Sequence, residues 1–359
     1  MNIDKTADII IIGGGIAGAI AALSCAVNKT KIIWFAPKAN FKGGIQISPK
    51  TINALKKLGV YKDLKKFLTP IFMIRIRDPN KLSDLIKIDL PKNYFSISRD
   101  NFFSVLHKTI LKKPSIIIKN TEIVSFYQNE NTVECISAES EIFQSKILIG
   151  ADGVNGITRK TVLGSSIKPL SNKVIRRSVI PSDKTLKPIN NSSINLWMGN
   201  GWHLVTYPIS NGEFINAVLV SNDLIPMFKE YKNPIIHLID NVNWFDYPLI
   251  NYNLTSTYHC NNIGLIGDAS HFFPPHIAQG AAQTIYDGVT LNDCIRKFGV
   301  CSKAINNYSK TRRPEVDQII QYSNFFGKLL GMSGLKAKLR NNSIIFGKPI
   351  LGKLLYDLW

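Results

Sequence analysis

Hydrophobic residues first occur in this chain as short, unbroken runs. Four isoleucines follow Asp8, and residues 31–35 are apolar from Ile32 onward. Runs of this length without a polar residue are typical of parallel strands that are covered on both faces. Small residues fill positions 19–27 between the two runs and predict a helix. The first 36 residues are therefore predicted to form strand, helix and strand.

Strands and helices are predicted along the rest of the chain by alternation and by helical spacing. The predicted strands are 72–77, 85–90, 116–118, 123–127, 132–137, 142–149, 194–198, 203–207 and 214–220. Asn200-Gly201 and Asn211-Gly212 separate the last three strands and are typical turns of antiparallel hairpins. The predicted helices are 51–58, 101–111, 289–297 and 302–330.

Glycines at the first strand–helix junction follow the spacing Gly13-x-Gly15-x-x-Gly18. Gly13 allows a tight turn, Gly15 lets a pyrophosphate approach the backbone, and Gly18 lets helix and strand pack closely. The fingerprint alone is a weak signal, but the order of strand, glycines, helix and strand strengthens it. We expect a dinucleotide site here.

One part of the fingerprint is missing. An acidic residue is expected about 20 residues after the glycines to hold a ribose. No Asp or Glu occurs between Asp8 and Asp63. Lys38, Asn40 or backbone groups are the candidates to hold the ribose instead.

Two acids follow apolar strands later in the chain. Asp152-Gly153 comes after the strand predicted at 142–149, with Arg159 a few residues on. Asp268 follows residues 263–266 and Gly267, and a Pro-bearing loop then leads to a helix at Gly280. A helix N-terminus favours an anionic ligand, whereas an acid favours hydroxyl groups. A dinucleotide offers both.

Composition narrows the possible classes of protein. The chain has 359 residues, no apolar run reaches the roughly 18 residues that a membrane span needs, and the formal net charge is +19. The lysines are spread over the whole chain, so we expect a basic surface rather than a nucleic-acid-binding protein. The five cysteines lack CxxC spacing, which favours a reducing, cytoplasmic setting without a metal site or redox disulfide.

The glycine fingerprint, Gly150-Ala-Asp152-Gly153 and Gly267-Asp268-Ala269-x-His271 stand in one order along the chain. Together they resemble the class A FAD-dependent aromatic hydroxylases, and the resemblance covers nearly the whole chain. Residues 44–49, 199–208 and 275–282 look closest to salicylate and hydroxybenzoate hydroxylases, and ubiquinone-ring hydroxylases come second. The chain departs from the family pattern by lacking the ribose acid, by Gly156 in place of Ser and by Tyr286 in place of Glu.

The resemblance implies an α/β fold in which an FAD/NAD(P)-binding Rossmann-like domain is interleaved with an antiparallel-sheet substrate domain. We expect the FAD-binding domain over 1–70, 92–164 and 256–300, the substrate domain over 71–91 and 165–255, and C-terminal helices over 301–359. It also implies that NADH or NADPH reduces FAD, which then activates O₂ for insertion into an aromatic ring. The expected cofactor-binding residues are Gly13, Gly15, Ile16, Ala17, Gly18, Arg99, Val124, Asp152, Gly267, Asp268, Gln279, Gly280, Ala281 and Ala282.

Substrate residues are expected between residues 275–282, which look like the flavin loop of the family, and the antiparallel strands. A phenol needs a donor or base for its oxygen, and a carboxylate needs a cation. His203, Tyr207 and Pro275 are the expected catalytic residues, and Arg177 and His276 the expected substrate contacts; each residue could instead be purely structural. Arg177 could bind either a carboxylate or the pyridine nucleotide.

Three functions remain open. The first is hydroxylation of salicylate or a related hydroxybenzoate. The second is hydroxylation of a quinone precursor at a membrane, because basic and apolar residues alternate over 336–353 and could contact anionic lipid. The third is a non-catalytic basic binding protein. Either a monomer or a homodimer is compatible with the sequence.

Overall fold

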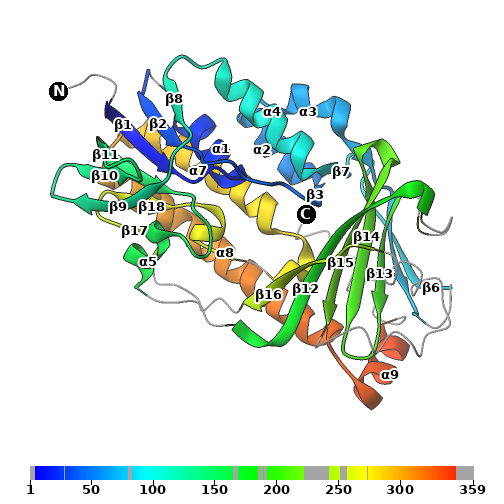
Figure 1. Cartoon of the computed structure of the whole chain (residues 1–359). Coiled ribbons are helices and arrows are strands. Elements are labelled where there is room, and N and C mark those ends of the chain that lie inside the picture. Colours follow the sequence, from blue (N-terminus) through cyan, green and yellow to red (C-terminus); the bar gives the residue numbers. More distant parts are fainter. Residues whose placement is uncertain are drawn as a thin grey trace.

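The computed structural model describes residues 5–344 except 28, 80–82, 165–168, 185–188, 190–191, 222–241, 251–256 and 273. The predicted tail therefore lies outside the described residues beyond position 344. Two sheets dominate the molecule, a mainly parallel one on the left of Figure 1 and an antiparallel one on the right. Within the described residues, no helix is long and apolar enough to cross a membrane.

The mainly parallel sheet has eight strands, and its central path runs β17-β18-β11-β1-β2-β8. β1, β2, β8, β11 and β18 pair in parallel, whereas β10 and β17 join antiparallel. The four isoleucines of β1 are fully or almost fully buried, which confirms the prediction from their unbroken run. The strands are β1 Thr6–Ile12, β2 Ile32–Phe35, β8 Ile116–Lys119, β9 Ile123–Gln128, β10 Val133–Ser137, β11 Ile142–Gly150, β17 His259–Cys260 and β18 Ile263–Leu265.

The second sheet has seven strands in the order β16-β12-β15-β14-β13-β5-β6. All of its pairs are antiparallel except β13 with β5. The strands are β5 Met73–Arg77, β6 Asp84–Asp89, β12 Pro169–Pro181, β13 Ser193–Met198, β14 His203–Ile209, β15 Phe214–Ser221 and β16 Phe245–Ile250. The alternation at 72–77 and 85–90 thus belongs to this sheet, while β12 and β16 were not predicted.

A small sheet joins the two larger ones. Its strands are β3 Gly44–Ile47, β4 Thr69–Pro70 and β7 Phe95–Ser98, in the order β3-β7-β4. Asn216 of β15 accepts a hydrogen bond from the Gly44 backbone N–H (2.8 Å), and the Ser96 hydroxyl donates to the Pro208 carbonyl. These hydrogen bonds connect the antiparallel sheet to the small sheet at β3 and β7.

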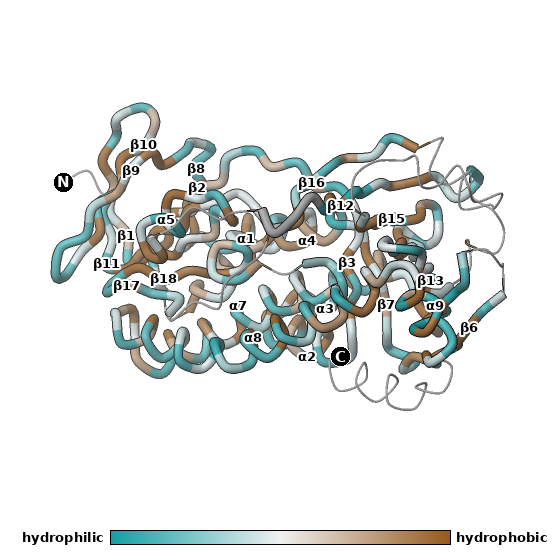
Figure 2. The backbone as a smooth tube through the Cα atoms, turned by 90° about the horizontal axis from the view of Figure 1, so that it is seen from below, coloured by the Kyte–Doolittle hydropathy of each residue, from teal (hydrophilic) through white to brown (hydrophobic). Residues whose placement is uncertain are grey.

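Helices cover the parallel sheet and extend towards the second sheet. They are α1 Ile16–Cys25, α2 Pro49–Lys57, α3 Tyr61–Leu64, α4 Arg99–Leu111, α5 Ile157–Leu163, α7 Gly280–Phe298, α8 Ser302–Leu330 and α9 Gly334–Ser343. α8 runs beneath both halves in Figure 1, and hydrophilic residues follow its outer edge in Figure 2. Its predicted bounds are confirmed, whereas the helix predicted at 289–297 is the second half of the longer α7.

The fold class predicted from the sequence is thus confirmed: a Rossmann-like parallel sheet, an antiparallel sheet and C-terminal helices. The predicted domain limits place β1–β4, β7–β11 and β17–β18 in one unit, and β5–β6 and β12–β16 in the other. The two large sheets follow this division. The exact limits stay a prediction.

Candidate active site

A cavity of about 760 Å³ opens between the two sheets. Its floor comes from the turns after β1, β11 and β18 and from the start of α7, and its roof from β12, β14 and β15. Thirteen predicted site residues line it: Gly13, Gly15, Ile16, Ala17, Arg99, Asp152, Arg177, Tyr207, Asp268, Pro275, Gln279, Gly280 and Ala281. Residues nearly 270 positions apart are thus brought to one cavity.

The β1–α1 turn forms one end of the floor. Gly13 has φ +128°, and a Cβ there would lie 2.2 Å from the Ala151 carbonyl oxygen. A Cβ on Gly18 would lie 1.9 Å from the Gly13 carbonyl oxygen, so Gly18 packs helix against strand without lining the cavity. Nothing lies within 4 Å of where a Gly15 Cβ would be. This open space next to the backbone suits a phosphate group that approaches closely.

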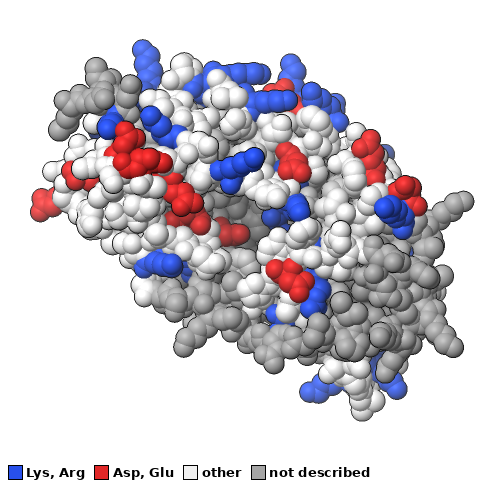
Figure 3. All heavy atoms as spheres, in the orientation of Figure 1, with Lys and Arg blue, Asp and Glu red and all other residues white. Residues whose placement is uncertain are grey.

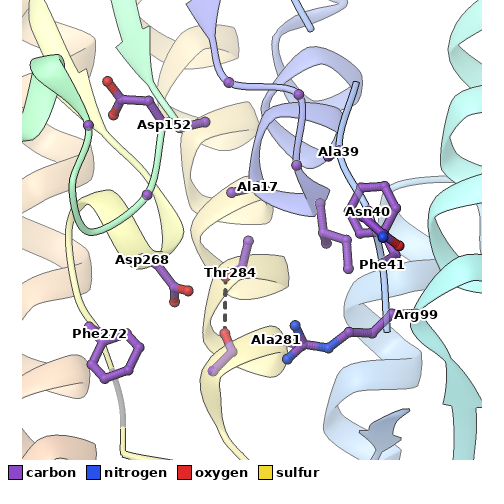
Figure 4. Close-up of a pocket in the computed structure, with 18 of the residues that line it drawn as sticks. Ala17, Ala39, Asn40, Phe41, Arg99, Asp152, Asp268, Phe272, Ala281 and Thr284 are labelled. Atoms are coloured by element: carbon purple, nitrogen blue, oxygen red, sulfur yellow. Dashed lines mark hydrogen bonds between the residues drawn. The ribbon is translucent and has the colours of Figure 1, made fainter. Parts of the chain in front are cut away.

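Two helix N-termini point at the cavity. α1 begins after Gly15 and α7 after Gln279, and neither has a side-chain cap. The first N–H groups of a helix lack partners within the helix and carry a partial positive charge. Thr284 holds the first turn of α7 by donating to the Gly280 carbonyl at 3.0 Å (Figure 4). Ala282 is buried behind this turn and does not line the cavity.

Asp268 sits in the 3₁₀ turn Gly267–Ala269 (η6) after β18 and faces the cavity. Figure 4 shows its carboxylate and the Arg99 side chain directed at the same space beside Thr284 and Ala281. Surrounding protein desolvates the carboxyl and raises its pKa, although Arg99 favours its charged form. Gly267 has φ +63° and packs against Ala17, so it shapes the turn rather than lining the cavity.

Asp152 lines the cavity, but its carboxylate turns away from the centre in Figure 4. It accepts hydrogen bonds from the backbone N–H of Thr158 (2.9 Å) and from the Thr158 hydroxyl, and so caps α5. A Cβ on Gly156 would lie 2.0 Å from the Asp152 carboxyl carbon. The carboxylate therefore occupies the space of the missing side chain at 156, and the predicted role of Asp152 as a cofactor contact remains a prediction.

A buried ionic network supports the floor from below. Asp287 of α7 accepts from Arg312 Nε of α8 at 2.8 Å and lies 2.6 Å from His271 Nε2. Its second oxygen also accepts from the Gly267 backbone N–H at 3.1 Å. Burial alone would raise the pKa of Asp287, but His271 and Arg312 outweigh it and lower the pKa. The network fixes the η6 turn to both helices.

Cavity-facing residues of the roof alternate along the strands. Val205 and Tyr207 of β14, Val218 of β15 and Arg177 of β12 all line the cavity. Within the described residues, neither the Tyr207 hydroxyl nor the Arg177 guanidinium forms a hydrogen bond with protein, and Arg177 lies 5.8 Å from the Tyr247 ring centre. Burial raises the pKa of Tyr207 to about 12 and lowers that of Arg177 to about 10. At neutral pH the roof thus offers a phenol donor and a cation.

Besides Gly18, Gly267 and Ala282, three further predicted site residues do not line the cavity. His203 is buried on the same face of β14 as Val205 and Tyr207 but outside the cavity, and 3.4 Å separate its Nε2 from Nδ1 of His276 in the flavin loop. Neither lines the cavity. Val124 is 53% exposed on β9 and is likewise absent from the lining. The cavity gives these three predicted roles no support.

Glu122 lines the cavity although the sequence analysis did not predict it as a site residue. Glu122, after β8, is exposed and lines the cavity at the same end as Lys38 and Asn40. It supplies an acid where the end of β2 has none. No signal pointed to it, because it lies some 100 residues from the glycine fingerprint in the sequence. Lys38 and Asn40, the suggested substitutes for the ribose acid, line the cavity as well.

A family model described as FAD binding domain matches residues 6–202, which is more than half of the chain. The chain belongs to the class A FAD-dependent aromatic monooxygenases. Relatives include a 3-hydroxybenzoate 6-hydroxylase of Klebsiella oxytoca, 25% identical, with 92% of this chain and 91% of the relative covered. 3-Hydroxybenzoate 6-hydroxylase 1 of Aquipseudomonas alcaligenes is also 25% identical, with 93% and 92% covered.

Solved structures share the fold of this monooxygenase. Klebsiella pneumoniae HpxO complexed with FAD and uric acid aligns with a TM-score of 0.84 at 16% identity, over 99% of this chain and 97% of that one. A salicylate hydroxylase substrate complex aligns with a TM-score of 0.78 at 18% identity, over 98% and 96%. Identities this low show the fold alone.

The cavity suits FAD. Its floor combines the open backbone at Gly15, two uncapped helix N-termini and the Asp268 carboxylate, which match a pyrophosphate and a polyhydroxyl chain. When bound, FAD supplies the electron transfer and oxygen activation of this enzyme class. The β1–α1 turn would hold the phosphates, and the N–H groups at the start of α7 would favour negative charge on the ring.

Proposed function

We propose that this monooxygenase hydroxylates a small hydroxybenzoate, with salicylate and 3-hydroxybenzoate as the first substrates to test. The observation that carries the proposal is the pairing of a cation, Arg177, with a phenol donor, Tyr207, on a roof otherwise lined by valines. A hydroxybenzoate offers a carboxylate, a phenol oxygen and an apolar ring in the same small volume. The names of the relatives from Klebsiella and Aquipseudomonas support this substrate class.

Arg177 is the proposed carboxylate ligand. Its pKa of about 10 keeps it charged at neutral pH, and the partial burial that lowers the pKa also strengthens an ion pair with a bound anion. Arg99 lowers the pKa of Arg177 as well, so positive charge from two elements reaches the same cavity. A neutral phenol cannot form an ion pair with Arg177. We therefore expect the site to bind aromatic acids more tightly than phenols.

Tyr207 is the proposed partner of the ring oxygen. Its raised pKa, about 12, keeps its hydroxyl protonated, so it donates a hydrogen bond rather than accepting a proton. The ring lies against Gly44, where a Cβ would come within 2.7 Å of it, and this packing holds the hydroxyl in place. Pro275, also in the lining, closes the floor side and helps to exclude water.

NADH or NADPH is the proposed reductant. The sequence contains a single glycine fingerprint, and FAD uses that site, so the pyridine nucleotide has to approach from the open part of the cavity. The structure favours neither nucleotide over the other.

The test is a purified protein assayed for colour, reductant use and product. We expect a yellow protein whose NADH or NADPH oxidation rises with salicylate or 3-hydroxybenzoate and yields one hydroxylated product per reductant. 4-Hydroxybenzoate, benzoate, phenol and a buffer blank are the comparison arms. A yellow protein that oxidises NAD(P)H at the same rate with and without every hydroxybenzoate would contradict the proposal.

One observation favours a second candidate, a ring hydroxylase that works at a membrane surface. α9 exposes Leu335 (72%) and Leu339 (57%) one turn apart, with Lys336 and Lys338 between them. An exposed apolar pair flanked by cations fits peripheral contact with anionic lipid. Elsewhere, acidic residues are interspersed among the basic ones on the face shown in Figure 3. Sedimentation with anionic but not neutral vesicles, lost in Leu335→Ser/Leu339→Ser, is the expected result if this candidate holds.

A further inference from the structure

Two histidines meet between the flavin loop and the antiparallel sheet, outside the cavity. His203 begins β14 and is 2% exposed, and His276 lies in the 3₁₀ turn Pro275–Ile277 (η7) of the flavin loop. His276 Nδ1 is 3.4 Å from His203 Nε2, and the ring centres are 5.2 Å apart. One ring nitrogen therefore donates and the other accepts.

α8 holds the same loop from a third side. A Cβ on Gly327 would lie 2.6 Å from His276 Cδ2 and Nε2, so the imidazole packs directly on the helix backbone. The buried Ser323 hydroxyl, one turn earlier, donates to the Pro274 carbonyl at 3.1 Å. Ile277 packs against Phe326 in a small hydrophobic cluster. His276 is thus the point at which loop, helix and sheet meet.

The residues around His276 explain why its position matters to the cavity. Pro275 before it and Gln279 after it both line the cavity, and α7 starts at the next residue, Gly280. Ala278 adopts φ +54°, a left-handed conformation that non-glycine residues adopt rarely. A strained turn persists only where its surroundings hold it in place. The side chain of His276 is one such anchor.

The surroundings of both imidazoles favour their neutral form. Burial and the nearby Lys173 lower the pKa of His276 to about 4, and burial, His276, Lys173 and Arg340 lower that of His203 well below its ordinary value. His203 Nδ1 is buried and has no hydrogen-bond partner within the described residues. A charged His203 would need an acceptor there, so the packing fits a neutral pair.

We propose that His203 and His276 are positioning residues that clamp the flavin loop against the antiparallel sheet. The clamp sets where Pro275 and the N-terminus of α7 lie relative to the roof. Neither histidine lines the cavity, so the clamp acts through the loop. The inference rests on the FAD-binding assignment, and on the proposed function only for the choice of substrate in one readout.

The experiment compares two variants of each histidine in the full-length protein. His276→Leu and His203→Leu remove the hydrogen bond, whereas His276→Asn and His203→Gln keep a polar atom near Nδ1 and Nε2, respectively. His259→Asn is the matched control, because His259 is half-buried, bonded to Thr257 and absent from the cavity lining. The readouts are the FAD dissociation constant, the fluorescence of bound flavin, and the share of NAD(P)H oxidation that yields hydrogen peroxide instead of product.

We expect the Leu variants to bind FAD about tenfold more weakly, to alter flavin fluorescence and to lose more reductant to hydrogen peroxide. The Asn and Gln variants should recover most of each property, and His259→Asn should match the parent. The proposal is overturned if folded Leu variants match the parent in FAD affinity and fluorescence, or if Asn and Gln variants are as impaired as Leu. The Asn and Gln variants decide the matter if a Leu variant does not fold.

Failure of the proposed function would look different. A parent protein that binds FAD but hydroxylates none of the acids removes the substrate assignment. FAD affinity and flavin fluorescence still test the clamp in that case, because neither depends on a ring substrate.

Discussion

The floor and the roof of the cavity recognise their ligands by different means. The floor uses main chain: glycines that bring backbone close, and helix N-termini without side-chain caps. The roof uses side chains at alternating strand positions, among them Arg177 and Tyr207. Backbone groups serve a cofactor that is shared across a family, whereas side chains can change from one member to the next.

The two regions also respond differently to substitution. Most floor residues are also held by packing, so changing them affects folding and FAD binding together, whereas a side chain at Gly15 would meet only open space. A roof residue projects from an intact strand, so changing it affects only the ligand it faces.

Asp287→Asn should lower the free energy of unfolding more than any other substitution considered. It removes the buried charge that pairs with Arg312 and His271, and breaking a buried ion pair costs about 3–5 kcal/mol of unfolding free energy. Denaturant unfolding of the apoprotein measures this. Asp246→Asn is the control, since Asp246 is more than half exposed where it pairs with Arg176. Equal stability of the two variants would show that the network does not support the floor.

Gly13→Ala and Gly15→Ala should separate folding from cofactor binding. Gly13→Ala forces an unfavourable φ and a clash with Ala151, so we expect a loss of about 3 kcal/mol or more together with loss of FAD. Gly15→Ala meets no protein atom and should leave the apoprotein stable while weakening FAD binding. Thermal melts with and without FAD distinguish the two. A Gly15→Ala protein that binds FAD like the parent would contradict the phosphate site.

Acid should destabilise the protein through His276. Its pKa is about 4 in the folded protein and near 6.5 when unfolded, so the unfolded state binds a proton first as pH falls. Stability is full above about pH 6.5 and declines towards pH 4, by at most about 3 kcal/mol for this group. His276→Leu should flatten the slope over this range. Parallel pH–stability profiles for parent and variant would refute the assignment.

Arg177→Gln should raise the KM for the preferred acid by about 10- to 100-fold, because a charge-assisted hydrogen bond is worth about 1.5–3 kcal/mol. FAD affinity should stay within a factor of two, since the substitution lies on the roof. The KM for a neutral phenol should barely change, which makes phenol the internal control. A comparable loss for acid and phenol would mean that Arg177 supports the sheet and does not bind the carboxylate.

Tyr247→Leu should change the KM for the acid substrate only slightly. Its ring lies 5.8 Å from the Arg177 guanidinium and is 46% exposed, and such a cation–π contact is worth about 0.5–1 kcal/mol. We expect a two- to fivefold rise in KM for the acid with kcat unchanged, and Tyr247→Phe should restore the parent value. A change in kcat alone would point away from a role in orienting Arg177.

Most of the floor could be predicted from the sequence because its signals are local. An apolar run, three glycines at fixed spacing and an acid after a strand each occupy a few consecutive residues. The structure brings Gly15 and Asp268 to one cavity, in agreement with these signals. Glu122 was not predicted as a cavity residue. Its position near Lys38 and Asn40 depends on the pairing of β8 with β2, and no local sequence pattern indicates that pairing.

The roof could be predicted less well, because alternation gives the face on which a strand residue lies but not how far along the strand the cavity extends. His203 and Tyr207 both belong to β14, yet only Tyr207 lines the cavity. β12, which carries Arg177, has no clear alternation and was not predicted as a strand. Asp152 shows a different limit: its position was foreseen, but the bond to Thr158 and the space over Gly156 decide where its carboxylate points.

The alternation of Val205, Tyr207, Val218 and Arg177 along three adjacent strands has a practical consequence for engineering. A combinatorial library confined to these four codons varies the shape and polarity of the ring compartment while every glycine of the floor stays as it is. Selection for new substrates can then be carried out on a scaffold whose loading with FAD is constant. Variants from such a screen differ in what they oxidise and not in whether they are assembled.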